Sequence, residues 1–414
     1  MQFESGLLHI GSQSAHDLAE KYGTPLYVYD AATIRRQIER VKGAFARLPF
    51  RPFFAMKANS NAAILRLVRE HGFGCDAVSP GEIFIAKHAG FTSEEIWFTC
   101  SNVSDDDLRA LMLRTDDARI VINVNSVSEI DRILRLGLQN PIALRVNPDV
   151  GAGHHADVVT AGEGVKFGID LAEVRDARMI VEDTGRRVVG IHAHIGSGVD
   201  HIAPLLDSAR RLLELVPDFP HLRFVNFGGG LSVPYKPGEA EFPIDEYGDG
   251  LTTLADKLLR ARDVDAILEP GRYVVAQSGF LIARVTARRI SGGTTWVGVD
   301  TGFNHLVRPS KYGAYHHIVN CTQRERTEDV VVAGNLCESG DVFTRNSERE
   351  VVTRTIDEPQ IGDLLALCDA GAYGFSMASL YNARLLPPEI VVDGEDARVV
   401  RSRQTYDDLV RGME

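Results

Sequence analysis

The sequence predicts an α/β chain in which a closed (β/α)8 barrel of the TIM type is followed by an all-β, Greek-key or barrel-like domain. From about residue 30, apolar strand-like runs alternate with amphipathic helical stretches, a pattern typical of repeated βα units around a parallel sheet. After Gly271 the pattern changes to β-branched, alternating segments separated by glycine-rich turns. A chain of 414 residues with 44% hydrophobic content is long enough to build both cores.

Eight apolar runs are interpreted as the barrel strands. They are Pro52–Lys57, Cys75–Ser79, Ile96–Cys100, Arg119–Asn125, Ile142–Asn147, Val188–Ile195, Phe224–Gly228 and Val264–Glu269. The helix candidates between them, with apolar residues at three- and four-residue spacing, include Ala62–Glu70, Glu82–Ala89, Val127–Leu136, Pro204–Leu215 and Leu251–Arg262. Eight repeats predict a closed barrel over residues 30–276.

The all-β domain is expected over residues 277–414. Its predicted strands are Phe280–Arg289, Thr294–Val299, Val330–Ala333 and Asp363–Cys368. The early segment Leu7–Ile10 has no place in the barrel count, so we expect residues 1–29 to add a strand to this domain.

The charge of the chain excludes several classes of partner. A formal net charge of −12 and an isoelectric point near 5.6, without a basic tract, argue against binding to nucleic acid. No signal peptide and no apolar run of membrane-spanning length are found, so we expect a cytoplasmic protein without a membrane partner. Five scattered cysteines without CxxC spacing support neither disulfides nor a zinc site, and we predict no metal.

Polar residues end several of the predicted strands, where a barrel of this kind carries its reactive groups. They are Lys57, Asp76, Arg145, His194, Gly228–Gly230 and Glu269. A lysine held at a strand end and facing an open loop suits an amine that attacks a carbonyl, although most such lysines are solvated caps. Together these residues predict a cofactor site.

Pyridoxal phosphate requires an amine, a phosphate cradle, a partner for the pyridine nitrogen and a group against the ring. Gly228–Gly230 lets backbone N–H groups approach an anion, and the Glu269–Arg272 turn adds a positive charge, although a glycine triplet is more often a tight turn. Glu269 can accept a hydrogen bond from the pyridine nitrogen, or instead pair with Arg272. His194 can pack on the ring. His192 lies two residues earlier on the same strand and points to the same face, so only the strand-end position favours His194.

Six segments resemble, in order and over nearly the whole chain, those of the diaminopimelate decarboxylase family. They are Phe54–Asn59, His192–Val199, Gly228–Ser232, Glu269–Arg272, Cys337–Asp341 and Asp369–Gly374. This family belongs to the alanine-racemase-like pyridoxal phosphate enzymes, which have a barrel followed by a β domain and generally work as head-to-tail dimers. The resemblance implies decarboxylation of meso-2,6-diaminopimelate, at its D centre, to L-lysine, the last step of lysine biosynthesis.

The resemblance also implies roles for individual residues. Lys57 would bond covalently to the cofactor, His194 would stack on the ring, and Glu269 would contact the pyridine nitrogen. Further cofactor contacts are implied for Asp76, Ser197, Gly229, Gly230, Gly271, Arg272 and Tyr373. Cys337 is implied as the acid that protonates the product carbanion. Substrate contacts are implied for Arg272, Arg308, Tyr312, Glu338 and Tyr373. Some residues of this group would come from the other subunit of a homodimer.

The chemistry of the substrate agrees with these implied contacts. Diaminopimelate carries two ammonium and two carboxylate groups, so a selective pocket needs a cation for the remote carboxylate and an acid for the remote ammonium. Arg308, Tyr312 and Glu338 form such a set, although an exposed Arg-Pro loop and a buried, inert Cys337 are the structural alternatives. Residues 148–166, rich in Gly and His, are a candidate lid or a surface loop, and Asn335 replaces a family proline, which could soften the loop before Cys337.

Three alternatives remain open at this point. A decarboxylase of the same fold could act on ornithine, arginine or a carboxylated polyamine, but its pocket would lack the arginine for a remote carboxylate. An amino acid racemase needs a tyrosine acid opposite the lysine, unlike the Cys337-Glu338 loop. A non-catalytic carrier of pyridoxal phosphate has no use for the acid, so Lys57 together with Cys337 favours the enzyme.

Overall fold

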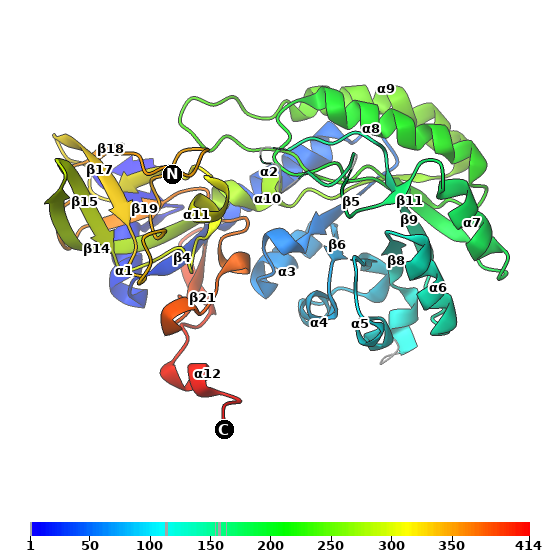
Figure 1. Cartoon of the computed structure of the whole chain (residues 1–414). Coiled ribbons are helices and arrows are strands. Elements are labelled where there is room, and N and C mark those ends of the chain that lie inside the picture. Colours follow the sequence, from blue (N-terminus) through cyan, green and yellow to red (C-terminus); the bar gives the residue numbers. More distant parts are fainter. Residues whose placement is uncertain (1, 112–114, 154, 156–158, 163) are drawn as a thin grey trace. The chain divides into compact units, whose positions relative to one another are not determined.

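The computed structural model describes the chain except for residues 1, 112–114, 154, 156–158 and 163 (Figure 1). It forms two compact units. The first comprises Met1–Gln37, Pro234–Ala240 and Val274–Glu414, and the second comprises Ile38–Val233 and Glu241–Tyr273. The domain boundaries expected at residues 30 and 277 stay predictions, and the two units meet along the chain at nearby residues. The sequence did not predict that residues 234–240 belong to the first unit.

The second unit is a closed barrel of eight parallel strands. They are β5 (Phe50–Ala55), β6 (Gly74–Ala77), β7 (Ile96–Thr99), β8 (Val121–Val124), β9 (Ile142–Asn147), β11 (Val188–His192), β12 (Phe224–Asn226) and β13 (Asp265–Leu268). Each strand pairs with the next in this order, and β13 pairs with β5 to close the ring. The short β10 (Ile169–Asp170) adds to β9. The predicted barrel is therefore confirmed.

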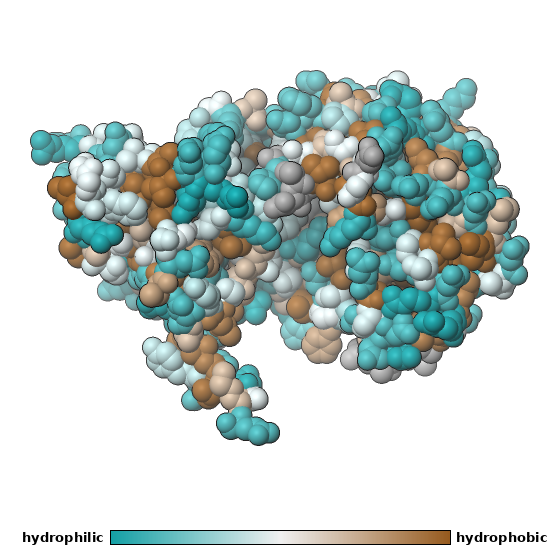
Figure 2. Space-filling view, in the orientation of Figure 1, coloured by the Kyte–Doolittle hydropathy of each residue, from teal (hydrophilic) through white to brown (hydrophobic). Residues whose placement is uncertain are grey.

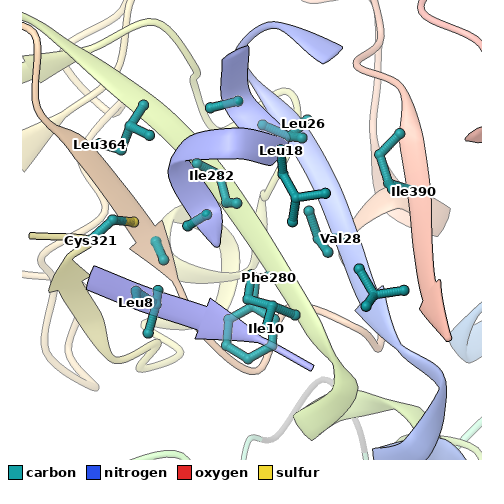
Figure 3. Close-up of a cluster of buried hydrophobic side chains, with 14 of the residues drawn as sticks. Leu8, Ile10, Leu18, Leu26, Val28, Phe280, Ile282, Cys321, Leu364 and Ile390 are labelled. Carbon is teal, nitrogen blue, oxygen red and sulfur yellow. The ribbon is translucent and has the colours of Figure 1, made fainter. Parts of the chain in front are cut away.

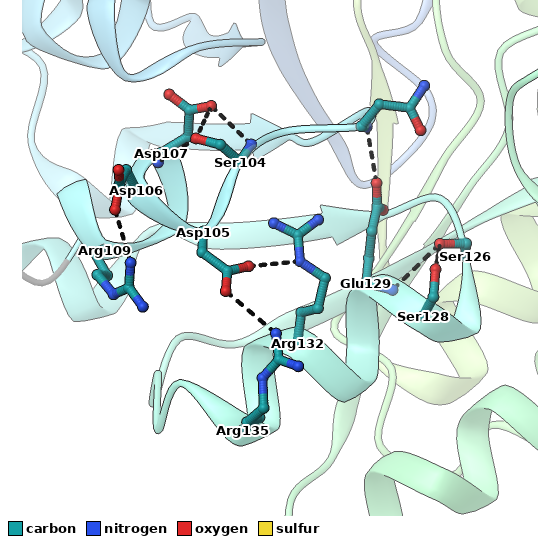
Figure 4. Close-up of polar contacts among 11 residues, drawn as sticks. Ser104, Asp105, Asp106, Asp107, Arg109, Ser126, Ser128, Glu129, Arg132 and Arg135 are labelled. Carbon is teal, nitrogen blue, oxygen red and sulfur yellow. Dashed lines mark hydrogen bonds and ion pairs between the residues drawn. The ribbon is translucent and has the colours of Figure 1, made fainter.

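Helices lie around the outside of the strands (Figure 1). They are α2 (Ala31–Ala44), which the two units share, α3 (Ala62–Glu70), α4 (Pro80–His88), α5 (Asp105–Ala110), α6 (Val127–Arg135), α7 (Val174–Glu182), α8 (Ile202–Leu215) and α9 (Ile244–Arg262). Side-chain caps set where they begin: in α5, Ser104 accepts from the Asp107 N–H, and three aspartates follow at the positive helix end (Figure 4). Asp105 also pairs with Arg132 and Arg135 of α6 (Figure 4).

Seven of the eight predicted barrel strands end one to three residues earlier than expected, and for β5 and β11 this changes the position of a predicted site residue. β5 stops at Ala55, and Lys57 lies in the single 3₁₀ turn η1 (Met56–Ala58) that follows. The chain turns there because the side chain of Asn59 accepts a hydrogen bond from the Asn61 N–H. β11 stops at His192, so the expectation that Lys57 and His194 lie within strands is wrong by two residues.

Aromatic side chains fill the barrel interior. The ring of Trp97 lies 4.4 Å from that of Phe53 and 4.3 Å from that of Phe224, measured between centroids. Gly190 of β11 faces this cluster: a Cβ there would lie 1.9 Å from the Phe224 ring. The barrel is thus a packed core, and the absence of a side chain at position 190 makes room for Phe224.

The first unit is built on a β sheet in the order β18-β17-β15-β14-β4-β20-β21, with β19 pairing β14 and β16. The strands are β4 (Leu26–Asp30), β14 (Gly279–Ser291), β15 (Thr294–Val299), β16 (Ile318–Asn320), β17 (Thr327–Ala333), β18 (Arg354–Asp357), β19 (Leu364–Leu367), β20 (Glu389–Asp393) and β21 (Asp396–Arg401). β4 runs antiparallel to β14 and parallel to β20. The predicted all-β domain is confirmed as β-rich.

The N-terminal strand within this sheet is β4 and not Leu7–Ile10. Leu7–Ile10 forms β2 in a small sheet with β1 (Gln2–Glu4) and β3 (Gln13–Ser14), and reaches the rest of the unit through a single bridge to Thr322. Its residues Leu8 and Ile10 are buried with Leu18 of α1 (Ala15–Tyr22) against β4 and β14 (Figure 3). The apolar signal of this segment therefore reflects packing on the sheet rather than pairing within it.

The described helices include none that is long and apolar enough to cross a membrane. The short C-terminal helix α12 (Tyr406–Val410) nevertheless exposes apolar side chains, at Tyr406, Val410 and Met413 just beyond it. The space-filling view shows hydrophobic colour over this segment (Figure 2). It is a candidate contact surface.

Adding one methyl group at Gly190 tests the packing of the barrel. We expect Gly190→Ala to lower the free energy of unfolding by about 2 kcal/mol or more, because the Phe224 ring must move. The control is Gly43→Ala in α2, where nothing lies within 4 Å of the added Cβ, and which should stabilise the protein by roughly 0.5–1 kcal/mol. Urea denaturation midpoints measure both; equal midpoints would show that the barrel interior adapts freely.

Candidate active site

Lys57 lies at the carboxyl end of β5, among buried acidic groups. Its positive charge acts on the carboxyl groups of Asp76, Glu82 and Glu269. Asp76 belongs to β6 and Glu269 follows β13, and these strands flank β5 on either side. The parallel barrel thus brings the predicted amine and the predicted partner of the pyridine nitrogen to one rim.

Asp76 is almost completely buried and holds a proton. Thr99 donates to its Oδ1 at 2.6 Å, whereas its Oδ2 has no hydrogen-bond partner among the described residues. Burial and the nearby charge of Glu269 raise the pKa of Asp76 to about 8, against the opposing effect of Lys57. An orphaned polar atom of this kind, beside Lys57, is available to a bound group.

Glu269 is the ionised member of the acid pair. Burial alone would raise the pKa of Glu269, but His192, Lys57 and a hydrogen bond from Asn226 outweigh it and hold the pKa below its usual range. His192 Nε2 lies 3.4 Å from Glu269 Oε2, and Asn226 also accepts from the Gly228 N–H. A fixed carboxylate results, which suits the nitrogen of a protonated pyridine.

A chain of buried polar groups links the two acids. Asn123 Nδ2 donates to His192 Nδ1 at 2.8 Å and approaches Thr99 Oγ1 at 3.4 Å, and Thr99 donates to Asp76. Because Asn123 donates to Nδ1, the His192 proton sits on Nε2, which faces Glu269. Glu269 thus has a hydrogen bond from Asn226 and the His192 Nε2 proton 3.4 Å away, whereas Asp76 has the hydrogen bond from Thr99, and this difference favours the charged form of Glu269.

The glycine triplet, the predicted phosphate cradle, lies so close to neighbouring backbone that no residue with a side chain could replace these glycines without a collision. A Cβ at Gly229 would lie 2.2 Å from the Glu269 carbonyl oxygen, and one at Gly230 would lie 2.3 Å from that of Gly196. Gly228 and Gly230 have φ of +72° and +95°, which glycine adopts without strain. The close approach of the backbone at this turn fits the phosphate of the cofactor.

Arg272 and Ser197 lie together beside this cradle. Arg272 is buried and donates from Nη2 to Ser197 Oγ at 2.9 Å. Gly271 allows the turn to approach the Lys57 segment, since a Cβ there would lie 2.9 Å from the Ala55 carbonyl oxygen. A hydroxyl, a guanidinium and the glycine backbone make a donor set that suits a phosphate group.

His194 lies between the cradle and the loop that was predicted as a lid. The Gly229 N–H donates to His194 Nδ1 at 3.3 Å, and Thr160 donates to the His194 carbonyl oxygen. Burial, Lys57 and Arg145 lower the pKa of His194 well below its usual range, so the ring is neutral and suited to stacking. Residues 154, 156–158 and 163 of the predicted lid lie outside the described residues.

The remaining predicted residues belong to the first unit. Arg308 and Tyr312 begin and end the short helix α11 (Arg308–Tyr312), which has Pro309 in its first turn. Tyr373 has φ of +57°, in a loop whose Gly371 N–H donates to the Ala276 carbonyl oxygen. The structure therefore brings the expected cofactor residues together in the barrel, apart from Tyr373, and places the expected substrate residues other than Arg272 in the β unit.

Cys337 is exposed and its loop is held by hydrogen bonds. Its N–H donates to Asn382 Oδ1, and the Asp341 carboxylate accepts from the Leu336 and Phe303 N–H groups. Asn335 donates its own N–H to the Thr301 carbonyl oxygen at 3.1 Å, a bond that proline could not make. The loop thus has an anchor that offsets the missing proline ring.

Residues 31–276 match the family described as "Pyridoxal-dependent decarboxylase, pyridoxal binding domain". The chain is 41% identical to the diaminopimelate decarboxylase of Methanothermobacter thermautotrophicus, over 99% of this chain and 96% of that protein. The chain belongs to the diaminopimelate decarboxylase family. The Escherichia coli K12 member of the family is 40% identical, over 95% of this chain and 94% of that protein.

Solved structures of the family have the same fold. The diaminopimelate decarboxylase of M. jannaschii in complex with L-lysine matches 100% of this chain and 97% of its own, with a TM-score of 0.89 and 34% identity. The resemblance found in the sequence is thereby confirmed, as are the barrel and the β-rich domain, and the cofactor of the family is pyridoxal 5'-phosphate.

Sequence reasoning missed several polar residues of the site. Glu82 accepts a hydrogen bond from the Val78 N–H. The sequence Ser79-Pro80-Gly81-Glu82 has the pattern of a helix N-cap, which could have predicted this role at the start of α4. Thr99, Asn123 and Asn226 stand at the last or next-to-last position of their strands, like Asp76, and that shared position was the available signal. Arg145, at the strand end, stacks on Phe167 at 4.5 Å.

Replacing Asp76 by asparagine, which does not titrate, tests whether Asp76 is protonated in the folded protein. The folded pKa of about 8 lies above the unfolded value of about 3.9, so wild-type stability falls as pH rises through this window. Asp76→Asn has no proton to lose, so its stability relative to wild type should rise across the window, by up to about 1.4 kcal/mol for each step of one in pH.

Urea midpoints of the cofactor-free protein, measured from about pH 4 to about pH 8, check this expectation. Asp105→Asn is the matched control: the hydrogen bond from Arg132 lowers the pKa of Asp105 below its ordinary value, so this carboxyl stays ionised across the measured range and the variant should differ from wild type by a constant amount. Parallel curves for wild type and Asp76→Asn would contradict a protonated Asp76.

Proposed function

We propose that this chain decarboxylates meso-2,6-diaminopimelate to L-lysine and carbon dioxide, the last step of lysine biosynthesis, using pyridoxal 5'-phosphate. The observation that carries the proposal is the grouping of Lys57, the ionised Glu269 and the glycine cradle at one rim of the barrel. Membership of the diaminopimelate decarboxylase family supports it. A cation, a phenol and an acid in the β unit suit a substrate with a second amino acid centre.

The barrel residues would hold the cofactor. Lys57 Nζ would bond covalently to its aldehyde carbon, Glu269 would accept a hydrogen bond from its pyridine nitrogen, and His194 would pack on its ring. The phosphate would be held by Ser197, Gly229, Gly230, Gly271, Arg272 and Tyr373, with Asp76 near the Lys57 amine. When bound, the cofactor supplies an electron sink for the pair released as carbon dioxide leaves.

Residues of this chain would then orient the substrate and move protons. Arg272, Arg308, Tyr312 and Tyr373 would bind the carboxylate groups, and Glu338 would bind the remote ammonium. The Cys337 thiol would deliver its proton to the former α-carbon, and Lys57 would recover its covalent bond to the cofactor as L-lysine leaves. On the family's pattern, the carboxylate lost would be the one at the D centre.

The site would be completed in a homodimer. Cys337 is exposed, yet an acid that protonates a carbanion must be screened from water, so a second copy covering it would meet this need. The exposed apolar residues Tyr406, Val410 and Met413 offer further contact area. We propose a head-to-tail dimer, in which Cys337 and Glu338 serve the barrel of the partner. We also propose a cytoplasmic location, which the five scattered cysteines without CxxC spacing support.

A substrate panel tests the activity directly. We expect carbon dioxide release from meso-diaminopimelate, and less than about a hundredth of that rate, corresponding to roughly 2.8 kcal/mol, from ornithine or arginine. Lys57→Ala should be inactive and should lack the visible absorption band that borohydride removes from the wild type. Preference for ornithine would move the assignment to another decarboxylase, and indifference to all three amino acids would indicate a carrier.

Mixing two inactive variants tests the shared site. Cys337→Ala should lower kcat by roughly 10²–10⁴-fold with little change in KM, because the thiol acts on a proton. Mixed with Lys57→Ala, it should recover about a quarter of wild-type activity, since half of the dimers are mixed and each has one intact site. Light scattering gives the mass in parallel; a monomer, or no recovery from an exchanging dimer, would overturn the proposed dimer.

A further inference from the structure

Arg308 is a charged side chain that the fold buries almost completely, with 2% of its surface exposed. It stands at the start of α11, where Pro309 fixes the first turn. A guanidinium removed from water must be surrounded by groups that accept its N–H bonds or stack on its face. Two of the groups in contact with it, His316 and Tyr235, have no role so far, and the carboxyl group of Asp369 is close enough for its charge to interact with that of Arg308.

Arg308, His316 and Tyr235 contact one another in pairs. Arg308 Nη1 lies 2.8 Å from His316 Nε2, and the guanidinium carbon lies 4.7 Å from the centroid of the Tyr235 ring. The rings of Tyr235 and His316 meet edge to face, 5.5 Å apart at 72°. Tyr235 lies in the segment of residues 234–240, which belongs to the same unit as α11.

The protonation of His316 follows from its two partners. Arginine has only donors, so His316 Nε2 must accept from Arg308 Nη1. The ring proton therefore sits on Nδ1, which lies 2.8 Å from the Cys368 carbonyl oxygen and donates to it. Both ring nitrogens are used, and His316, itself buried, is held as one neutral tautomer.

We propose that His316 is a positioning residue for the substrate: it fixes the guanidinium of Arg308 so that this group can bind the remote carboxylate of diaminopimelate. The inference rests on the proposed function, which gives Arg308 that carboxylate. His316 touches no reacting atom; it acts through Arg308. Its backbone lies just before β16, and Cys368 just after β19, two strands that pair with each other, so the acceptor has a rigid base.

The geometry explains why this position matters. A guanidinium recognises a carboxylate through a planar fork of N–H groups, so the plane must be set before the ligand arrives. His316 sets the direction of Nη1, and Tyr235 limits rotation by covering one face. Without the His316 acceptor, Nη1 loses this hydrogen bond and the plane of the guanidinium is less strictly set.

Two substitutions of His316 separate the acceptor from the rest of the ring. His316→Gln can place its amide oxygen near the position of Nε2 and keeps an acceptor for Arg308. His316→Asn is one methylene shorter; it can still donate to the Cys368 carbonyl oxygen but does not reach Arg308. His317→Asn is the matched control, because the neighbouring His317 contacts Tyr315 and has no hydrogen bond to Arg308 among those found in the described residues.

Binding of two ligands to the holoenzyme gives the readout. L-lysine carries the carboxylate that Arg308 would bind, whereas cadaverine has the same carbon chain and both amines but no carboxylate. Calorimetry measures Kd for each, and steady-state kinetics measures KM and kcat for diaminopimelate. These binding measurements do not depend on turnover, so a failure of the proposed activity is seen separately in the substrate panel.

We expect His316→Asn to raise Kd for L-lysine and KM for diaminopimelate by about tenfold or more, with Kd for cadaverine within about twofold of wild type. His316→Gln and His317→Asn should stay within about twofold of wild type for both ligands. Equal weakening of both ligands by His316→Asn, or no weakening of L-lysine, would overturn the proposal, because a merely structural histidine does not discriminate by carboxylate.

A second variant carries the test if His316→Asn does not fold. Tyr235 is only half-buried, so Tyr235→Leu should fold, and it removes the ring that covers the guanidinium. The same selective loss of L-lysine binding is expected, whereas Tyr235→Phe, which keeps the ring, should behave as wild type. Loss of cadaverine binding to the same extent would count against the proposal here too.

Discussion

The ionisation of two buried carboxyl groups beside one amine is the constraint on which this structure depends. Asp76 and Glu269 flank Lys57 and cannot both be charged at low cost, since neither has access to bulk water. Neighbouring polar groups resolve the conflict: Asn226 donates to Glu269 and His192 lies 3.4 Å from it, whereas Thr99 is the hydrogen-bond donor found for Asp76 among the described residues. The barrel is thereby left with one carboxylate, one protonated acid and one amine in fixed positions.

The rest of the architecture brings groups to that rim or gives them a rigid base. Parallel strands end together, so residues far apart in sequence meet without long loops. Glycines 229 and 230 leave space where a Cβ would collide with backbone. In the other unit the same principle recurs: Arg308 is buried beside His316, whose Nε2 accepts its hydrogen bond, so a flexible side chain acquires a defined direction. In both places, buried polar groups set the charge or the direction of a neighbouring side chain.

Most of the fold could be predicted from periodicity, because the barrel strands are continuous apolar runs and the helices have a clear apolar face. The exact end of β5 could not, since Asn59 turns the chain through a side-chain hydrogen bond that the pattern of apolar residues does not reveal. The cofactor residues were found through motifs. The roles of Thr99, Asn123 and His192 were missed because they come from contacts across neighbouring strands, and strand pairing places these residues together only in the folded barrel.

The position of β4 in its sheet affects how the chain can fold while it is being synthesised. This strand is made within the first thirty residues, yet its partners β14 and β20 begin at Gly279 and Glu389. The nascent polypeptide must therefore carry an apolar segment, Leu26 to Tyr29, with unsatisfied edges throughout synthesis of the barrel. Vectorial folding can finish the barrel first, but the β-rich unit closes only when translation is nearly complete, which makes this segment a natural client for chaperones.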